Sequence, residues 1–213
     1  MADGELRIMQ LLCSRLCHDL VGPVSAMNNG VELIEDSPGM LSDSLSLIDV
    51  SAKQASRRLA FFRAAFGFGG DDGPGALKDI RSLTADFTDG GNVVLDWPDA
   101  AAAPAVSRDA AKLILNMVLL GIGALPRGGA LTVHIGEIGD GCGIALTAAG
   151  KGAAVKDDIY AAMAADFPLD DLSAHTVQGY FTTRLARAAG AEIEVMQNGD
   201  GEVQLAAVVP SKS

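Results

Sequence analysis

The chain has 213 residues, of which 49% are hydrophobic and 5% aromatic, and it carries a net charge of -11. This hydrophobic content supplies a core and excludes wholesale disorder, while the acidic balance argues against nucleic acids and anionic membranes as main partners. No signal peptide opens the chain, and no apolar stretch approaches the roughly 20 residues of a membrane span. Three cysteines without a dense framework suit a reducing compartment. The sequence predicts a cytoplasmic globular protein.

The first 66 residues have helical spacing throughout. Apolar side chains recur at steps of three or four in two runs, which Asp36-Ser37-Pro38-Gly39 separates with turn chemistry. A short connection between two long helices favours an antiparallel hairpin. We call the apolar positions of both runs the seam; they are Leu6, Met9, Cys13, Leu16, Leu20, Val24, Met27, Val31 and Ile34, followed by Leu41, Leu45, Ile48, Ala52, Ala55, Leu59, Phe62 and Phe66.

Two helices alone cannot enclose such a seam, because each apolar stripe needs a second layer to cover it. The second run alternates steps of four and three, as in a heptad repeat. We therefore expect two copies of the chain to form a four-helix bundle, which makes the protein a homodimer.

A glycine-rich stretch from Gly67 to Gly75 predicts a linker, with one domain over residues 1–68 and a second over 76–213. The second part predicts helices over 76–88, 108–125, 155–165 and 173–189. It predicts strands over 92–97, 130–138, 143–149, 191–197 and 202–209, with Gly139-Asp140-Gly141-Cys142-Gly143 as a hairpin turn. This order favours an α+β protein whose second domain is an α/β sandwich, with helices on one face of a mixed sheet.

His18 falls about 160° from the centre of the apolar stripe of its helix, so it faces solvent with Asp19 beside it. Gly22 and Pro23 follow within two turns, and both disfavour the middle of a helix. One interpretation is that they end the helix and leave His18 an ordinary surface residue. The other is that His18 is an accessible nucleophile able to carry a phosphoryl group. Its face also holds Ser14, Arg15, Gly22 and Ser25.

His18-Asp19-Leu20-Val21-Gly22-Pro23-Val24 resembles the H-box of sensor histidine kinases, and the longer segment from Leu12 to Asp36 resembles the ChpT family of alphaproteobacterial histidine phosphotransferases. The resemblance implies a kinase-like ATPase fold after residue 76. There the N-box of the kinases aligns with 113–120 but keeps one asparagine, Asn116. The G1 position has Ala148-Ala149-Gly150, without an adenine-reading aspartate. At the G2 position, Gln178-Gly179-Tyr180-Phe181 replaces phosphate-binding glycines. We expect a degenerate domain that binds no nucleotide.

The resemblance implies a phosphotransferase that relays phosphoryl groups between receiver-domain aspartates, from a hybrid kinase to CtrA- and CpdR-like response regulators. His18 would be the phosphate carrier and Asp19 would orient its imidazole, with no bound cofactor and with Mg²⁺ supplied by the receiver. The candidate docking residues are Arg15, Gly22, Ser25, Arg57 and Arg58. The last two are included because they fall level with His18 in an antiparallel hairpin. A divergent ATP-dependent kinase core and a non-catalytic receiver-binding adaptor remain the alternatives.

Other candidate sites are weaker. Cys13 and Cys17 sit four apart on one helix, but no second pair completes the tetrahedral set that zinc needs. His134 and His175 have no convincing partner in the sequence. Lys53 and Arg63 complete a basic group with Arg57 and Arg58, for which a solvated face is the simplest interpretation.

Overall fold

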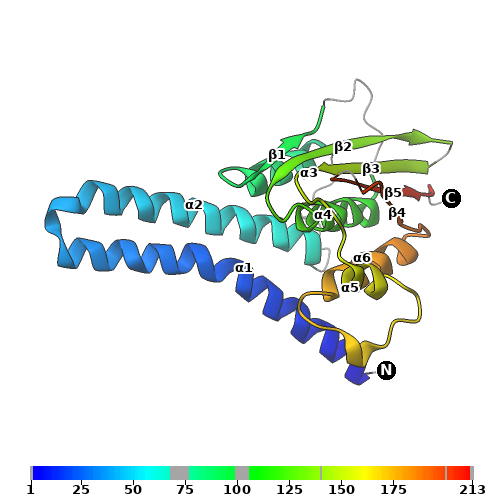
Figure 1. Ribbon diagram of the computed structural model, residues 1–213, viewed down its shortest axis with the longest axis horizontal. Coiled ribbons are helices and arrows are strands. Elements are labelled where there is room, and N and C mark those ends of the chain that lie inside the picture. The colour runs from blue at the N-terminus through cyan, green and yellow to red at the C-terminus, as the bar shows by residue number, and fades with distance from the viewer. Residues whose placement is uncertain (1, 68–76, 99–105, 140, 200, 212–213) are drawn as a thin grey trace.

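A computed structural model describes residues 2–67, 77–98, 106–139, 141–199 and 201–211. A long helical hairpin projects from one side of a sheet domain, and the start of the first helix lies beside the helices of that domain (Figure 1). The described hairpin lies within residues 1–68 and the described sheet domain within residues 76–213, and their division into two domains stays a prediction. The expected linker lies outside the described residues apart from Gly67.

The hairpin consists of α1 (Ala2–Asp36) and α2 (Leu41–Phe66), joined through the short 3-10 helix η1 (Pro38–Met40). Helix α1 runs without a break through Pro23, so the interpretation that Gly22 and Pro23 end a helix is wrong. The two helices come close together at Gly30, where a Cβ atom would lie 2.6 Å from the Cγ1 atom of Ile48. A side chain at this position would therefore push the helices apart.

The described residues of the sheet domain form five strands in the order β1-β2-β3-β5-β4. They are β1 (Val93–Asp96), β2 (Gly129–Ile138), β3 (Gly141–Ala149), β4 (Glu194–Gln197) and β5 (Glu202–Val209). Strand β1 pairs parallel with β2, whereas all the other pairs are antiparallel. The sheet is therefore mixed, and both expected hairpins, β2-β3 and β4-β5, are confirmed.

Helices α3 (Leu77–Thr88), α4 (Arg108–Gly123), α5 (Asp157–Ala162) and α6 (Val177–Ala188) complete the domain, with a 3-10 turn η2 (Leu169–Asp171) between the last two. The α+β class is confirmed, but several predicted boundaries are wrong. Strand β3 begins at Gly141 rather than at 143, which shortens the predicted turn, and β4 begins at Glu194 rather than at 191. Helix α6 begins at Val177 rather than at 173, because Ser173 and Thr176 exchange side-chain to backbone hydrogen bonds of 3.1 and 3.2 Å in a local turn. Helix α5 has six residues, far fewer than the expected span of 155–165.

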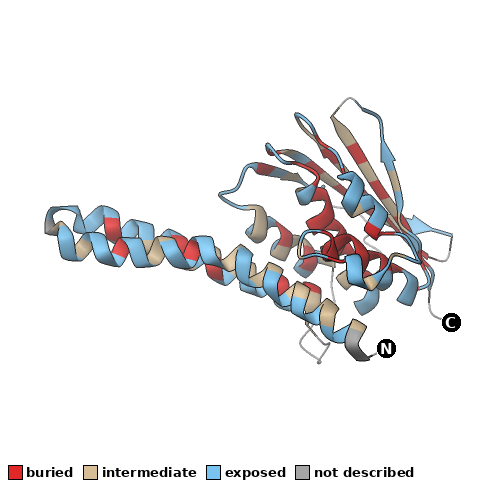
Figure 2. Cartoon of the chain, turned by 60° about the horizontal axis from the view of Figure 1, so that its bottom comes forward, coloured by how far each residue is buried: buried red, intermediate tan, exposed pale blue. Residues whose placement is uncertain are grey.

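The core of the sheet domain includes the end of the hairpin. Helix α4 is buried over nearly its whole length, and Phe61, Phe62 and Ala65 of α2 belong to the same hydrophobic cluster. Buried residues concentrate in the sheet domain and in the adjoining turns of the hairpin, while the far part of the hairpin is largely exposed (Figure 2). The last turns of α2 therefore connect the two parts by packing as well as by chain.

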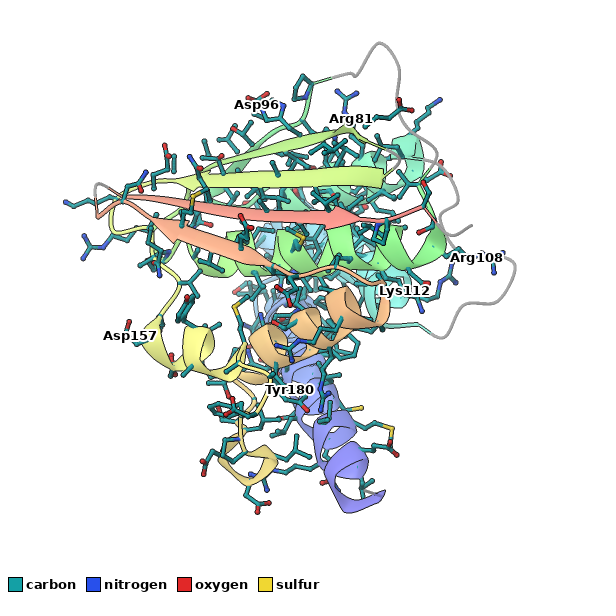
Figure 3. All side chains as sticks on the ribbon, turned by 90° about the vertical axis from the view of Figure 1, so that its right-hand side faces the viewer. Arg81, Asp96, Arg108, Lys112, Asp157 and Tyr180 are labelled. Carbon is teal, nitrogen blue, oxygen red and sulfur yellow. The ribbon has the colours of Figure 1, made fainter. Side chains whose placement is uncertain are left out.

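The start of α1 docks on the segment that precedes α6. A second hydrophobic cluster joins Tyr180, Leu172 and Ala162, and Ile8 and Leu11 of α1 pack against it. Tyr180 lies on α6 where this helix passes α1 (Figure 3). Arg7 donates hydrogen bonds from Nη2 to the carbonyl oxygens of Asp170 (2.8 Å) and Leu172 (3.0 Å). Both helices of the hairpin are thus attached to the sheet domain.

None of the described helices is long and apolar enough to cross a membrane.

Candidate functional site

His18 stands on the outer surface of α1, with 88% of its side chain exposed. Its Nδ1 atom lies 3.4 Å from Oδ1 of Asp19. An ionised carboxylate only accepts hydrogen bonds, so a hydrogen bond at this contact requires the ring proton on Nδ1, and in that tautomer the lone pair is on Nε2. The predicted exposure of His18 is confirmed, and its ring is open to a partner.

Small residues surround His18 along its helix. Ser14, Gly22 and Ser25 are all exposed. A Cβ atom on Gly22 would meet no other atom of the chain within 4 Å, so internal packing does not require glycine here. The absence of a side chain at this position instead leaves room above the helix, one turn from His18.

Arg58 reaches across the hairpin to the turn that carries His18. Its Nη1 atom donates a hydrogen bond of 2.5 Å to the backbone carbonyl oxygen of Asp19, in a partly buried position. Arg58 therefore lies level with His18 as predicted, and its contact is with the neighbouring residue, Asp19.

Two other basic residues of α2, Lys53 and Arg57, are engaged elsewhere. Arg57 forms an ion pair with Asp89, which follows α3, and Lys53 pairs with Asp49 one turn earlier on α2 at 2.6 Å. Arg57 is thus turned towards the sheet domain by a partner that the sequence did not reveal, because Asp89 lies 32 residues away along the chain.

Arg15 points inward rather than outward. It lines a cavity of about 100 Å³ together with residues of the sheet domain, which are Leu119, Leu120, Gly123, Ala124, Val155, Ile159, His175 and Gln178. Burial lowers the pKa of the Arg15 guanidinium from its ordinary value, and the nearby Asp19 carboxylate opposes this effect. The Arg15 side chain thus extends from the turn of α1 before His18 towards helices α4 and α6.

Asn116, the residue that aligns with the kinase N-box, is fully buried at 0% exposure. Its amide donates to the carbonyl oxygens of Ala65 (2.9 Å) and Lys112 (2.8 Å), and its Oδ1 accepts from Nε2 of Gln178 (2.9 Å). These bonds tie α2, α4 and α6 together. Both amide hydrogens of Asn116 are therefore used inside the protein.

The aromatic pair at the expected G2 position also serves the hairpin. Tyr180 packs in the cluster that receives α1, and the ring of Phe181 lies 5.6 Å, centroid to centroid, from that of Phe66 on α2. At the position where a kinase would have phosphate-binding glycines, the side chains of Tyr180 and Phe181 pack against α1 and α2.

The remaining histidines and cysteines do not assemble into a centre. Within the described ranges, no three His, Cys, Asp or Glu residues come together in a group that could hold a metal ion. Cys13 and Cys17 are exposed, whereas burial raises the pKa of the Cys142 thiol. Contrary to the prediction from sequence, His175 has an acidic neighbour, since its Nε2 lies 3.6 Å from Oδ2 of Asp158.

Residues 77–201 match the family described as the histidine phosphotransferase C-terminal domain, which is more than half of the chain. The chain belongs to the histidine phosphotransferase family. It is 36% identical over 193 residues to a protein phosphotransferase ChpT from Brucella abortus (strain 2308), covering 90% of this chain and 91% of the relative. A solved structure described as a bacterial phosphotransferase is similar over 95% of this chain and 96% of its own, at 33% identity and a TM-score of 0.81.

The region that matches the family model includes Asn116, which is committed to internal hydrogen bonds, and does not include the exposed His18. Sequence reasoning missed Arg7, which fixes α1 on the sheet domain, because its partners are backbone atoms more than 160 residues away.

Proposed function

We propose that this phosphotransferase relays a phosphoryl group between receiver-domain aspartates through a phosphohistidine at His18. The observation that carries the proposal is the geometry of His18: an exposed ring in the middle of a continuous helix, with Nδ1 beside the Asp19 carboxylate and small residues on the same face. Such a ring is a nucleophile near neutral pH that a folded partner can reach.

In the proposed reaction, the lone pair of Nε2 attacks the phosphorus atom of a receiver's aspartyl phosphate. A nitrogen–phosphorus bond forms, the oxygen–phosphorus bond breaks, and the receiver's carboxylate leaves. Transfer to the second receiver is the reverse process, in which a carboxylate oxygen displaces Nε2. Mg²⁺ held by the receiver would neutralise the charge of the transferring group.

Asp19 stabilises the charge that this reaction creates on His18. Phosphorylation of Nε2 while Nδ1 keeps its proton makes the ring cationic, and the Asp19 carboxylate 3.4 Å from Nδ1 favours that state. The same contact holds the tautomer in which Nε2 is free. Asp19 therefore prepares the ring for attack and steadies the product.

Receiver domains are the proposed partners, namely those of a hybrid kinase and of CtrA- and CpdR-like regulators, as the family resemblance implies. Ser25 and the open space above Gly22 support a docking surface around His18, with Arg58 at its edge. Arg15 and Arg57 turn towards the sheet domain, which gives them a part in shaping this surface rather than in touching the partner.

We further propose that the protein does not use ATP. The amide of Asn116 is bonded internally, and the cavity beside Gln178 has a volume of about 100 Å³, well below the roughly 300 Å³ at which small-molecule sites begin. A larger hollow of about 590 Å³ lies between α3 and β1 and includes no residue of the N-box, G1 or G2 positions. A divergent kinase core is accordingly the weaker alternative.

A homodimer joined through the hairpins completes the proposal. Of the seventeen large hydrophobic residues that are exposed among the described ones, twelve lie on the hairpin. Seven of these belong to the seam, and they are Leu6, Met9, Val24, Val31, Leu41, Leu45 and Leu59. Pairing two hairpins into a four-helix bundle would bury these seven side chains. Each Å² of apolar surface removed from water would stabilise the dimer by about 25 cal/mol.

The relay is tested by mixing the full chain with a phosphorylated receiver domain and mapping acid-labile phosphate by mass spectrometry. We expect label on His18 and none on the variant His18→Ala. This variant should keep the oligomeric state and the melting temperature of the wild type, because an exposed side chain contributes little to folding. His175→Ala, which alters another exposed histidine, is the matched control and should be labelled as the wild type is.

Wild-type protein that binds the receiver but acquires no phosphate would support the adaptor instead. Label persisting in His18→Ala would move the site elsewhere.

A further inference from the structure

The turn that carries His18 contains a defect in its backbone hydrogen bonds. In an α-helix the carbonyl oxygen of Asp19 would accept a hydrogen bond from the N–H of residue 23. Residue 23 is proline, which has no N–H, and its ring crowds the carbonyl group four residues earlier. Since α1 continues through this point, the defect lies within the helix rather than at its end.

Arg58 supplies the missing donor. Its Nη1 atom lies 2.5 Å from the carbonyl oxygen of Asp19, and the bond is partly shielded from water. A backbone acceptor left without a partner in such a place destabilises the turn. Pro23 itself is buried, so water has limited access to this side of the helix.

This use of an arginine differs from that of its neighbours on α2. Lys53 and Arg57 each pair with a carboxylate, Asp49 and Asp89 respectively. Arg58 instead bonds to the main chain of the residue that orients His18. Its guanidinium stays charged, so the hydrogen bond to this carbonyl oxygen is charge-assisted.

We propose that Arg58 is a positioning residue for phosphotransfer: it replaces the backbone donor that Pro23 lacks, and so fixes the turn holding Asp19 and His18. This inference rests on the proposed function of His18 as phosphate carrier. The direction of the Nε2 lone pair follows the orientation of this turn, and reaction rates are sensitive to small errors in such orientation.

The alternative role for Arg58 is direct contact with the phosphoryl group or with the receiver. The two roles differ in their dependence on Pro23. In the variant Pro23→Ala, the new N–H can bond to the carbonyl oxygen of Asp19, so a positioning arginine becomes redundant. An arginine that contacts the partner is needed in either background.

The experiment is a double-mutant cycle on the full chain with Pro23→Ala and Arg58→Ala. Two quantities are measured: the rate of phosphoryl transfer to His18 from a phosphorylated receiver, and deuterium exchange of the amides in residues 14–27. We expect Arg58→Ala to slow transfer about tenfold and to speed exchange around Asp19 in the Pro23 background. In the Pro23→Ala background both effects should shrink to about twofold or less.

Two further variants complete the design. Arg58→Lys keeps a donor and should recover part of the transfer rate. Lys53→Ala removes another cation from α2 and should leave transfer unchanged.

An equal loss of transfer in both backgrounds would overturn the inference in favour of direct contact. The exchange measurement separates this result from a failure of the proposed function. If wild-type His18 takes no phosphate, the relay is wrong, yet Arg58→Ala must still open the turn only when residue 23 is proline. Unchanged exchange in Arg58→Ala would refute the positioning role whatever the outcome of transfer.

Discussion

The two parts of the molecule use their polar side chains in opposite ways. In the hairpin, His18 is 88% exposed and is available to other molecules. In the sheet domain, Asn116 and Gln178 are 0% and 1% exposed and bond to each other, and Asn116 also donates to the carbonyl oxygen of Ala65 of the hairpin. The difference shows that His18 can be reached by another molecule, while Asn116 and Gln178 stabilise the interior of the protein.

The apolar side chains divide in a similar way. The sheet domain encloses its large hydrophobic residues within one chain, and among the described residues only Val94, Ile138, Tyr160, Met196 and Val208 of that domain are exposed large hydrophobics. The hairpin leaves twelve such residues exposed. The first region buries most of its large hydrophobic side chains within one chain, whereas much of the second is exposed (Figure 2).

The largest effect is expected from removing the buried hydrogen bonds of Asn116. Asn116→Ala leaves the carbonyl oxygen of Ala65 and an amide hydrogen of Gln178 without their partners, so we expect a loss of about 3 kcal/mol in the free energy of unfolding. Chemical denaturation measures this loss. Asn29→Ala, the same change at an exposed position of α1, should cost no more than about 0.5 kcal/mol. Equal costs at both positions would remove the contrast between the regions.

A charge on the exposed seam should separate the hairpins with little effect on the fold of one chain. Leu45 is 52% exposed in the single chain, so Leu45→Glu is expected to change the unfolding free energy of the monomer by about 0.5 kcal/mol or less. In the proposed dimer the same charge would be buried without a partner. The mass measured by light scattering should therefore fall from about twice the 21.9 kDa chain mass in the wild type to the mass of a monomer in the variant.

Val50→Glu provides the control for this variant. Val50 is 61% exposed and lies about 140° around α2 from Leu45, outside the seam. It should leave the dimer intact. A wild-type protein that is monomeric, with both helices formed, would contradict the four-helix bundle and would make the exposed seam a surface for another partner.

The smallest effect is expected from adding nucleotide, which should not change the melting temperature within experimental error. If the polar residues of the sheet domain are committed to its interior, about 5 mM ATP with Mg²⁺ should leave the melting temperature of the wild type unchanged. Any ligand that binds the native state must raise it. A rise that Asn116→Ala abolishes would return Asn116 to the role of a nucleotide ligand.

The hairpin could be predicted closely because its signals are local. The seam follows helical spacing, and the turn at Asp36 to Gly39 is correctly placed between α1 and α2. His18 is exposed as expected because its angle around α1 follows from counting residues. The order of strands and helices after residue 76 was also readable, since β2-β3 and β4-β5 are hairpins with short connections.

What the sequence could not provide are contacts between distant segments. The pairing of Arg57 with Asp89 and the bonds from Arg7 to the segment before α6 depend on how α1 and α2 sit against the sheet domain. The inward turn of Arg15 has the same origin. One signal was present: Pro23 implies a carbonyl without a donor at Asp19, and Arg58 is the basic residue level with it.

The docking of α1 on the sheet domain has a consequence for how fast partners can be exchanged. Arg7 and the cluster around Tyr180 fix the start of α1, so His18 keeps its place relative to α6 before any partner arrives. A partner that touches both parts would meet a surface already ordered by folding, and the entropy cost of arranging the two parts would not recur at each encounter. Binding can then be brief and still productive, because specificity need not be achieved through slow rearrangement or a long-lived complex.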